Sequence, residues 1–200
     1  MGLIHVTKKH TGKMEGMQSI STSVRQNPYC QCRIKKGDTV CSKCYAETIM
    51  KMRPNVDSCM NKNGELLSSK VIDPDYLPKL NVLYFRFEAF GDLINATHVI
   101  NYFNICKKNP ETNFALWTKN PGLIDQAIKS GETKPDNLQI VYSSPKLDEI
   151  DEPKYDFIDK VFTVFHKDSD VEINCGKKKC MECKLCYKKN DVKYINERLK

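Results

Sequence analysis

The chain has 200 residues, ten of them cysteine, and its 32 Lys and Arg exceed its 25 Asp and Glu to give a formal net charge of +7. With 40% apolar and 28% charged residues and no run of about 18 apolar residues, the composition excludes a disordered chain and a membrane-spanning protein. The first residues also lack the apolar stretch typical of a secretory signal. We therefore expect a cytoplasmic protein without a membrane partner, built as one domain of roughly 100–200 residues or as one domain with a small appendage.

The first part of the chain predicts strands and helices in alternation. Residues 17–22 form a candidate strand, which four closely spaced cysteines follow. Apolar residues recur at helical spacing over 44–53, where an Arg-Pro pair ends the predicted helix. After a polar stretch, an Asp-Pro pair predicts the cap and first turn of a short helix over 73–79. The apolar, aromatic-rich run 82–87 is typical of a strand buried on both faces.

The middle of the chain continues this alternation. Asn95 begins a predicted helix, whose apolar stripe ends before Pro110. Residues 113–118 form the next strand. An Asn-Pro pair then supplies the cap and first position of a helix over 120–131, which ends at a glycine.

Two further strands, 138–143 and 161–165, bring the predicted total to about five. Such βαβ units favour a mainly parallel sheet, but a closed barrel needs eight strands and about 250 residues. We therefore expect an α/β fold, either a partial barrel or a doubly wound sheet, with ligands at the carboxyl ends of the strands. Residues 144–158 are predicted to be a long loop. The domains are predicted as a barrel over 1–170 and a cysteine- and lysine-rich, metal-binding extension over 171–200.

Eight of the ten cysteines fall into two compact groups. In a reducing cytoplasm cysteines stay as thiols, so metal ligation or catalysis is their default explanation. The first group is Cys30, Cys32, Cys41 and Cys44, and the second group is Cys175, Cys180, Cys183 and Cys186. Cys59 and Cys106 stand alone and are expected to be structural.

The second group has the spacing Cys-x4-Cys-x2-Cys-x2-Cys. Its consecutive two-residue gaps resemble the run that holds a 4Fe–4S cluster in bacterial ferredoxins. A structural zinc site more often divides its ligands into two widely separated pairs. This spacing predicts an iron–sulfur cluster, with zinc as the alternative.

The first group ends in a Cys-x2-Cys at the start of the predicted helix 44–53. Backbone N–H groups at a helix N-terminus favour thiolate over thiol. A zinc knuckle completed by Cys30 and Cys32 competes with an iron–sulfur cluster here. The βα context favours the cluster.

Three stretches carry a resemblance to a known superfamily: 41–47 (Cys-Ser-Lys-Cys-Tyr-Ala-Glu), 86–92 (Arg-Phe-Glu-Ala-Phe-Gly-Asp) and 116–121 (Leu-Trp-Thr-Lys-Asn-Pro). With the terminal cysteines they cover about residues 17–187, and the first stretch is the most specific. The chain resembles the radical S-adenosylmethionine (SAM) superfamily, most of all small phage-encoded radical-SAM-like proteins. The resemblance implies a radical-SAM-type partial (β/α) barrel in the cytoplasm of a bacterial host.

In that superfamily three cysteines bind a 4Fe–4S cluster, SAM chelates the fourth iron, and an electron from a donor cleaves SAM to a 5′-deoxyadenosyl radical. The usual spacing is Cys-x3-Cys-x2-Cys, but Gly37 stands where the first cysteine would be. The resemblance therefore assigns the triad to Cys32, Cys41 and Cys44. Cys30 is an extra thiol, and a fourth thiolate on the cluster would fill the position that SAM needs.

Four further residues are candidate cofactor contacts. By the resemblance, Gly91 would let the backbone approach SAM and Asp92 would bind its amino group, although Gly-Asp is also common turn chemistry. Arg86 stands inside an apolar strand, where Glu88 on the same face could be its partner, or where the pair could line the barrel mouth. Lys119 follows a strand and could meet a carboxylate or phosphate, although a solvated lysine is the commoner case.

The positive charge is concentrated around the second group, since residues 176–200 hold nine basic and three acidic residues, +6 of the total +7. Lysines beside Tyr187 or Tyr194 suit phosphates and stacked bases, so nucleic acid is a candidate partner of this basic tail. The same lysines would offset the charge of an anionic cluster or serve solubility.

These patterns predict an iron–sulfur protein that resembles radical SAM enzymes, with one cluster on the first group and a second centre on the second group. Its substrate is not indicated. The alternative is a non-catalytic redox or nucleic-acid-binding module that zinc or an iron–sulfur cluster stabilises. In a third interpretation both groups share one centre, since chain termini often lie near each other.

Overall fold

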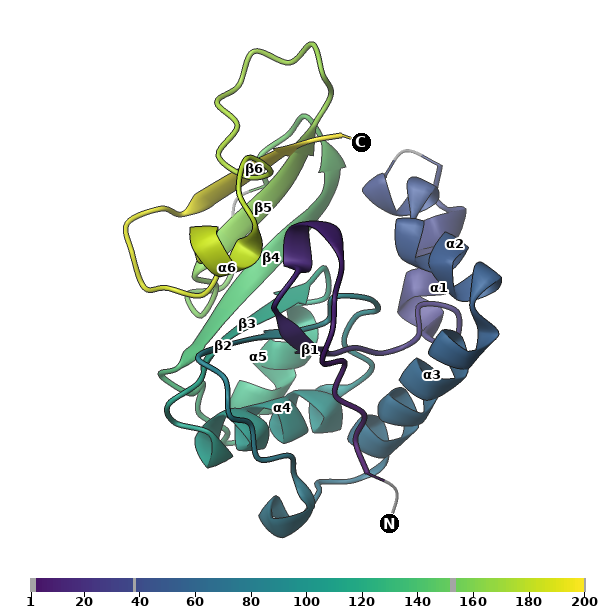
Figure 1. Ribbon diagram of the computed structural model, residues 1–200, viewed down its shortest axis with the longest axis vertical. Coiled ribbons are helices and arrows are strands. Elements are labelled where there is room, and N and C mark those ends of the chain that lie inside the picture. Colours follow the sequence, from purple (N-terminus) through teal and green to yellow (C-terminus); the bar gives the residue numbers. More distant parts are fainter. Residues whose placement is uncertain (1–2, 38, 152–153, 200) are drawn as a thin grey trace.

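Six parallel strands form one sheet, and their order across the sheet, β1-β2-β3-β4-β5-β6, is their order along the chain. The computed structural model describes residues 3–37, 39–151 and 154–199. Its strands are β1 Gln18–Ile20, β2 Tyr84–Phe87, β3 Asn113–Thr118, β4 Leu138–Leu147, β5 Lys160–Phe165 and β6 Tyr194–Arg198. Because β1 and β6 form the two edges, the sheet is open (Figure 1). The predicted parallel α/β sheet is confirmed, in a form compatible with a partial barrel.

Helices and short 3-10 turns connect these strands. The helices are α1 Pro28–Lys35, α2 Tyr45–Met52, α3 Pro54–Ser69, α4 Ala96–Lys108, α5 Gly122–Lys129 and α6 Cys180–Cys183. The 3-10 turns are η1 Gly12–Met14, η2 Val40–Lys43 and η3 Pro74–Tyr76. Helices α1 to α3 thus precede β2, α4 and α5 each form one crossover, and α6 lies between β5 and β6.

One face of the sheet packs against α3, α4 and α5. On β2, Phe85 and Phe87 point into this core, since alternate residues of a strand face opposite sides. Phe87 stacks on Tyr102 of α4, with ring centroids 4.0 Å apart, and on Phe114 of β3 at 5.1 Å. This aromatic core fixes β2 and β3, whose carboxyl ends lie at the first cysteine group.

The other face, which we call the inner face, is covered by the two end segments of the chain. Met17, Phe162 and Ile195 are buried there with Tyr187, and Cys175, Cys180 and Cys186 of the second group pack against them. Figure 1 shows η1 and α6 close together in front of the sheet, and the two elements are in contact. The C-terminal segment is therefore integrated with the sheet.

Two helices, α1 and α3, were not predicted from the sequence. Helix α3 runs over the stretch that we described only as polar, and its buried face carries Asp57, Asn63 and Gly64 beside Met60 and Leu67. These polar residues conceal the 3.6-residue apolar period on which helix prediction relies. Helix α1 has no buried residue at all.

Three other elements differ in extent. β4 continues to Leu147 across a register shift, so the predicted loop 144–158 begins later. β6 was not predicted, and it places residues 194–198 of the expected extension in the sheet beside β5. The predicted helix 73–79 is the single turn η3, because Pro78 cannot continue a helix.

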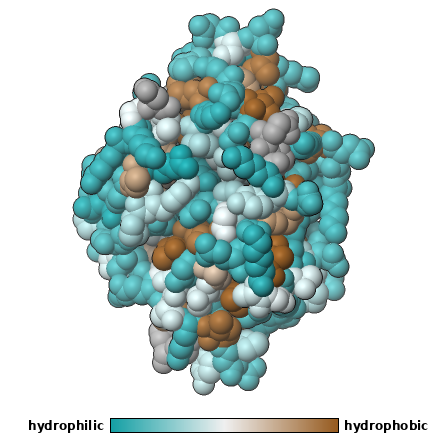
Figure 2. Space-filling view, turned by 180° about the vertical axis from the view of Figure 1, so that it is seen from behind, coloured by the Kyte–Doolittle hydropathy of each residue, from teal (hydrophilic) through white to brown (hydrophobic). Residues whose placement is uncertain are grey.

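Figure 2 shows the apolar side chains of one surface in separate patches between hydrophilic ones. Among the residues that the structure describes, no helix combines the length and apolar character needed to cross a bilayer.

Candidate metal centres

The first cysteine group lies on α1, η2 and the start of α2. Helix α1 begins after Asn27, whose Oδ1 accepts hydrogen bonds from the backbone N–H groups of Tyr29 (3.0 Å) and Cys30 (3.4 Å). The Asn27 amide nitrogen donates to the carbonyl oxygen of Asp92 at 2.8 Å. This N-cap ties the cysteine-bearing helix to the loop after β2.

Cys30 and Cys32 point to different sides of α1, because residues two apart in an α-helix lie about 200° apart around its axis. Cys30 packs with Cys44 against apolar residues of α2 and α3, whereas Cys32 is exposed. Burial raises the pKa of the Cys30 and Cys41 thiols, and a negative charge on Cys44 would raise both further. Cys30 and Cys41 thus each lie within electrostatic range of Cys44, whereas Cys32 is exposed. Which of the four cysteines bind a metal stays a prediction.

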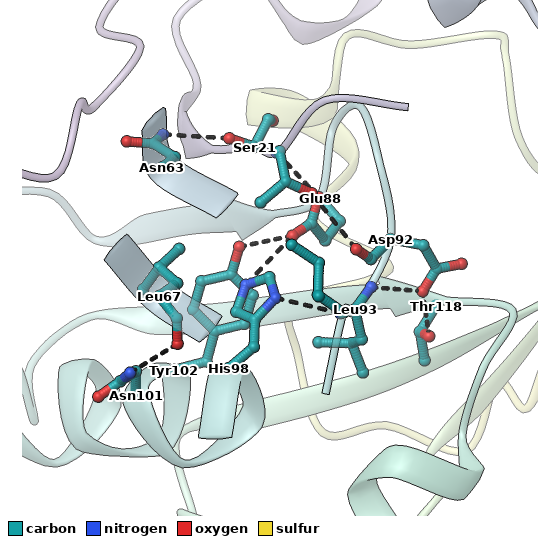
Figure 3. A network of polar contacts seen from close by, with 12 residues as sticks. Ser21, Asn63, Leu67, Glu88, Asp92, Leu93, His98, Asn101, Tyr102 and Thr118 are labelled. Carbon is teal, nitrogen blue, oxygen red and sulfur yellow. Dashed lines mark hydrogen bonds and ion pairs between the residues drawn. The ribbon is translucent and has the colours of Figure 1, made fainter. Parts of the chain in front are cut away.

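Asp92 joins the ends of β2 and β3 (Figure 3). Its Oδ1 accepts from the Thr118 hydroxyl (2.5 Å) and the Leu93 N–H (2.8 Å), and its Oδ2 accepts from the Lys119 N–H (2.8 Å). Burial raises the pKa of Asp92. The Lys119 ammonium donates to the Ser143 hydroxyl at 3.0 Å and lies within electrostatic range of the first cysteine group. Both predicted contact residues thus lie beside that group, and a contact of either with a cofactor stays a prediction.

Glu88 is the buried centre of a second polar network, which sequence reasoning missed. Its Oε2 accepts from the N–H (3.2 Å) and hydroxyl (3.0 Å) of Thr22, and its Oε1 accepts from the Tyr102 hydroxyl at 2.6 Å. The His98 Nε2 lies 3.5 Å from Oε1, and Figure 3 shows His98 and Tyr102 pointing toward Glu88. Burial raises the pKa of Glu88 to about 8 and lowers the pKa of His98 to about 3.

Gly91 lies where this network meets the end of β1. Its φ of +82° favours glycine, and a Cβ atom there would lie 2.4 Å from the Thr22 hydroxyl oxygen and 2.8 Å from Oε2 of Glu88. In this structure the missing side chain lets the chain approach Thr22. Its predicted role, letting the backbone approach SAM, stays a prediction.

Arg86 faces the second cysteine group on the inner face. Its guanidinium lies 4.2 Å from the centroid of the Trp117 ring, and Nη1 donates to the Met14 sulfur at 3.6 Å. The suggested pairing of Arg86 with Glu88 is wrong, because β2 ends at Phe87 and Glu88 adopts a left-handed φ of 54°. The pairing assumed that side chains two residues apart in a strand share a face, but Glu88 lies one residue beyond the end of β2.

The second cysteine group lines a cavity of about 320 Å³, in which Cys175, Cys180 and Cys186 are partly buried and Cys183 is exposed. Lys13 of η1 also lines this cavity, and its ammonium donates to the Cys175 sulfur (2.8 Å) and to Glu197 (2.9 Å). The charge of Arg86 lowers the pKa of Cys180 and Cys186, although burial keeps both thiol pKa values above their ordinary range. These lysine and arginine contacts carry no local sequence signal, since Lys13 and Cys175 are 162 positions apart.

The two cysteine groups lie apart, α1 and α2 on one side of the molecule and α6 on the other (Figure 1). The interpretation that both share one centre is therefore wrong for this structure. Within the described ranges, no three His, Cys, Asp or Glu side chains are close enough to hold one metal ion. Cys106 is fully buried in the aromatic core, which fits its expected structural role.

Tyr187 is 3% exposed, so its ring is not available to stack on a nucleic acid base. Lys177, Lys178 and Lys179 are exposed, and Lys177, Lys178 and Lys184 line the cavity. A nucleic acid partner stays a prediction that depends on these lysines.

The N-cap of α1 gives a direct test of how the first cysteine group is positioned. We expect Asn27→Ala to lower the free energy of unfolding by about 1 kcal/mol, because two N–H groups lose their acceptor. Asn27→Ser keeps an oxygen acceptor for the cap and should recover part of this loss. Urea unfolding of the three proteins measures the difference, and equal stability of Asn27→Ala and the wild type would contradict the capping role.

The fold and the two sites define an α/β protein with an open parallel sheet and two separate cysteine groups. The chain belongs to the family described as Gene product 88, a family of phage gene products, whose model matches residues 5–197. Comparison with curated proteins and with solved structures gives no match.

Proposed function

We propose that this phage-family protein is an iron–sulfur protein that resembles radical SAM enzymes and holds a 4Fe–4S cluster on Cys30, Cys41 and Cys44. The observation that supports the proposal is that Cys32 is exposed, whereas Cys30 and Cys44 pack in one cluster and Cys41 lies within electrostatic range of Cys44. A cluster held by three thiolates keeps one iron for another ligand. Because Cys32 points away on α1, the extra cysteine of the sequence does not compete for that iron.

The surroundings of these three thiols support a site for a small charged ligand. They lie beside the carboxyl ends of parallel strands, where ligands of open α/β sheets gather. Lys119 supplies a cation at this edge, where it could meet the carboxylate of SAM. The carboxyl of Asp92 accepts hydrogen bonds from three groups of its own chain, so its part is to hold the ends of β2 and β3 together.

When bound, the cluster would supply one electron, taken from an external donor, for cleavage of SAM to a 5′-deoxyadenosyl radical. The chain's own part is to hold the three thiols, to present a cation at Lys119 and to bury the site against α2 and α3. The radical would abstract hydrogen from a substrate whose identity no residue of the chain indicates.

The test is anaerobic purification followed by iron, sulfide and zinc analysis, and then incubation with SAM and dithionite. We expect iron and sulfide in equal amounts, a change of the reduced cluster's EPR spectrum on adding SAM, and formation of 5′-deoxyadenosine. A colourless protein with stoichiometric zinc and no sulfide would overturn the iron–sulfur proposal. The proposal of radical chemistry would be overturned if SAM left the EPR spectrum of the cluster unchanged and no 5′-deoxyadenosine were formed.

A nucleic-acid-binding module is the second candidate, because the excess positive charge lies in the C-terminal segment. Phosphate contacts release counterions, so the affinity for single-stranded DNA or RNA should fall steeply as salt rises. We expect Lys177→Gln/Lys178→Gln to weaken binding, with Lys8→Gln/Lys9→Gln as an exposed control pair. Binding that is insensitive to salt, or equally weakened by both pairs, would exclude a specific contact at this segment.

A further inference from the structure

We propose that the cavity under α6 holds a second 4Fe–4S cluster, ligated by all four thiolates of the second cysteine group and flanked by Lys13 and Arg86. This centre is separate from the SAM site of the proposed function and does not depend on it. Unlike the first group, it leaves no coordination position for an external ligand.

The size of the cavity favours a cluster over a single ion. Four thiolates around one zinc lie about 2.3 Å from it and thus converge on a point. Here all four cysteines line one space of about 320 Å³, which is far larger than a single ion needs. A 4Fe–4S cluster has a separate iron for each thiolate and fits four cysteines around a space of this size.

The charges around the cavity favour an anionic occupant. The side chain of Lys13 is 26% exposed, and its ammonium reaches Cys175 from the opposite end of the chain. The Nε atom of Arg86 is buried and finds no hydrogen-bond partner among the described residues. Lys13 already has Glu197 as a partner, so it is Arg86 that indicates an anion: a buried cation is costly unless an anion faces it, and an iron–sulfur cluster with four thiolates is such an anion.

The path of the chain from β5 to β6 also indicates that this connection needs stabilisation by a metal centre. The connection from β5 to β6 crosses the inner face, whereas α4 and α5 cross the other face, so its hand is opposite to theirs. Parallel strands strongly prefer right-handed crossovers. Apart from α6, which is one turn long, the segment 166–193 has no regular structure in the described residues. Metal binding would supply folding free energy for this segment.

Three cysteine variants of the full chain, purified anaerobically, test the site. The wild type should carry two clusters, about eight iron and eight sulfide per chain, and Cys59→Ser should match it. The double variants Cys41→Ser/Cys44→Ser and Cys180→Ser/Cys183→Ser should each keep about half of this iron and sulfide. This inference is overturned if Cys180→Ser/Cys183→Ser keeps all the iron. It is also overturned if Cys41→Ser/Cys44→Ser contains zinc and no sulfide. If instead Cys41→Ser/Cys44→Ser loses no iron, the proposed function fails while this site stands.

A second measurement leaves all four cysteines of the second group in place. In Cys41→Ser/Cys44→Ser, which isolates the second centre, we expect Lys13→Gln to shift the cluster's reduction potential to a more negative value at unchanged iron content. Removal of a nearby cation disfavours the extra electron. Lys9→Gln, at an exposed position, should leave the potential unchanged. An unchanged potential in Lys13→Gln would overturn the assignment of Lys13 to this centre.

Discussion

Cys30→Ser is expected to abolish the reductive cleavage of SAM, whereas Cys32→Ser is expected to leave it near the wild-type level. The two cysteines are two residues apart in α1, yet one is partly buried beside Cys44 and the other is exposed. Loss of a ligand should exceed the roughly 10- to 100-fold effect of substitutions that act behind the ligands. The measurement is 5′-deoxyadenosine formed per chain under dithionite.

This pair of variants is matched in chemistry and lies on the same helix but differs in burial. Circular dichroism of both proteins therefore checks that Cys30→Ser is as well folded as Cys32→Ser. Compared with the wild type, the iron content should be lower in Cys30→Ser and unchanged in Cys32→Ser. The opposite outcome, loss of iron and of cleavage in Cys32→Ser alone, would restore the triad suggested by the spacing of the sequence.

The contrast between these two cysteines shows where sequence reasoning stops. The spacing Cys-x-Cys resembles a loop, in which both thiols can turn to one metal. The Asn27-Pro28 pair, an N-cap followed by a proline in the first turn, is the local signal that a helix begins there. Once residues 28–35 are helical, geometry alone separates the two thiols.

The strands were the easiest part to predict, because buried parallel strands are short apolar runs that differ sharply from their surroundings. β3 has the predicted bounds, and β5 begins one residue earlier than predicted. β6 carries Asn196, Glu197 and Arg198, which are unusual in a buried run, and it is stabilised by its position at the edge beside β5. Its existence depends on tertiary contacts that no local pattern reports.

Contacts between distant parts of the chain were also beyond sequence reasoning. Lys13 meets Cys175, and Thr22 meets Glu88, across 162 and 66 positions. The prediction of two cysteine groups needed only short-range spacing, whereas the cations around the second group become visible only when both ends of the chain lie on the inner face.

The buried pair Glu88 and His98 is expected to make the stability of the protein fall as the pH rises from 6.5 to 8. The pKa of Glu88 is raised from 4.5 to about 8, so the folded state binds more protons than the unfolded state over that range. The pKa of His98 is lowered from 6.5 to about 3, which makes stability fall as the pH decreases from 6.5 toward 3. The two effects oppose each other between pH 4.5 and 6.5, and above pH 6.5 that of Glu88 alone remains. It amounts to about 2 kcal/mol by pH 8.

Glu88→Gln should remove this loss, because an amide of the same shape has no proton to release. Urea unfolding at pH 6.5 and 8, at one state of metal loading, measures it as the change in free energy of unfolding between the two values. Glu111→Gln, at an exposed position, should keep the wild-type dependence. A wild type that is equally stable at both pH values, or a Glu88→Gln variant that loses as much as the wild type, would show that Glu88 is ionised in the fold. The three hydrogen bonds from Thr22 and Tyr102 would then stabilise a carboxylate, and the network would join β1, β2 and α4 as a buried anion.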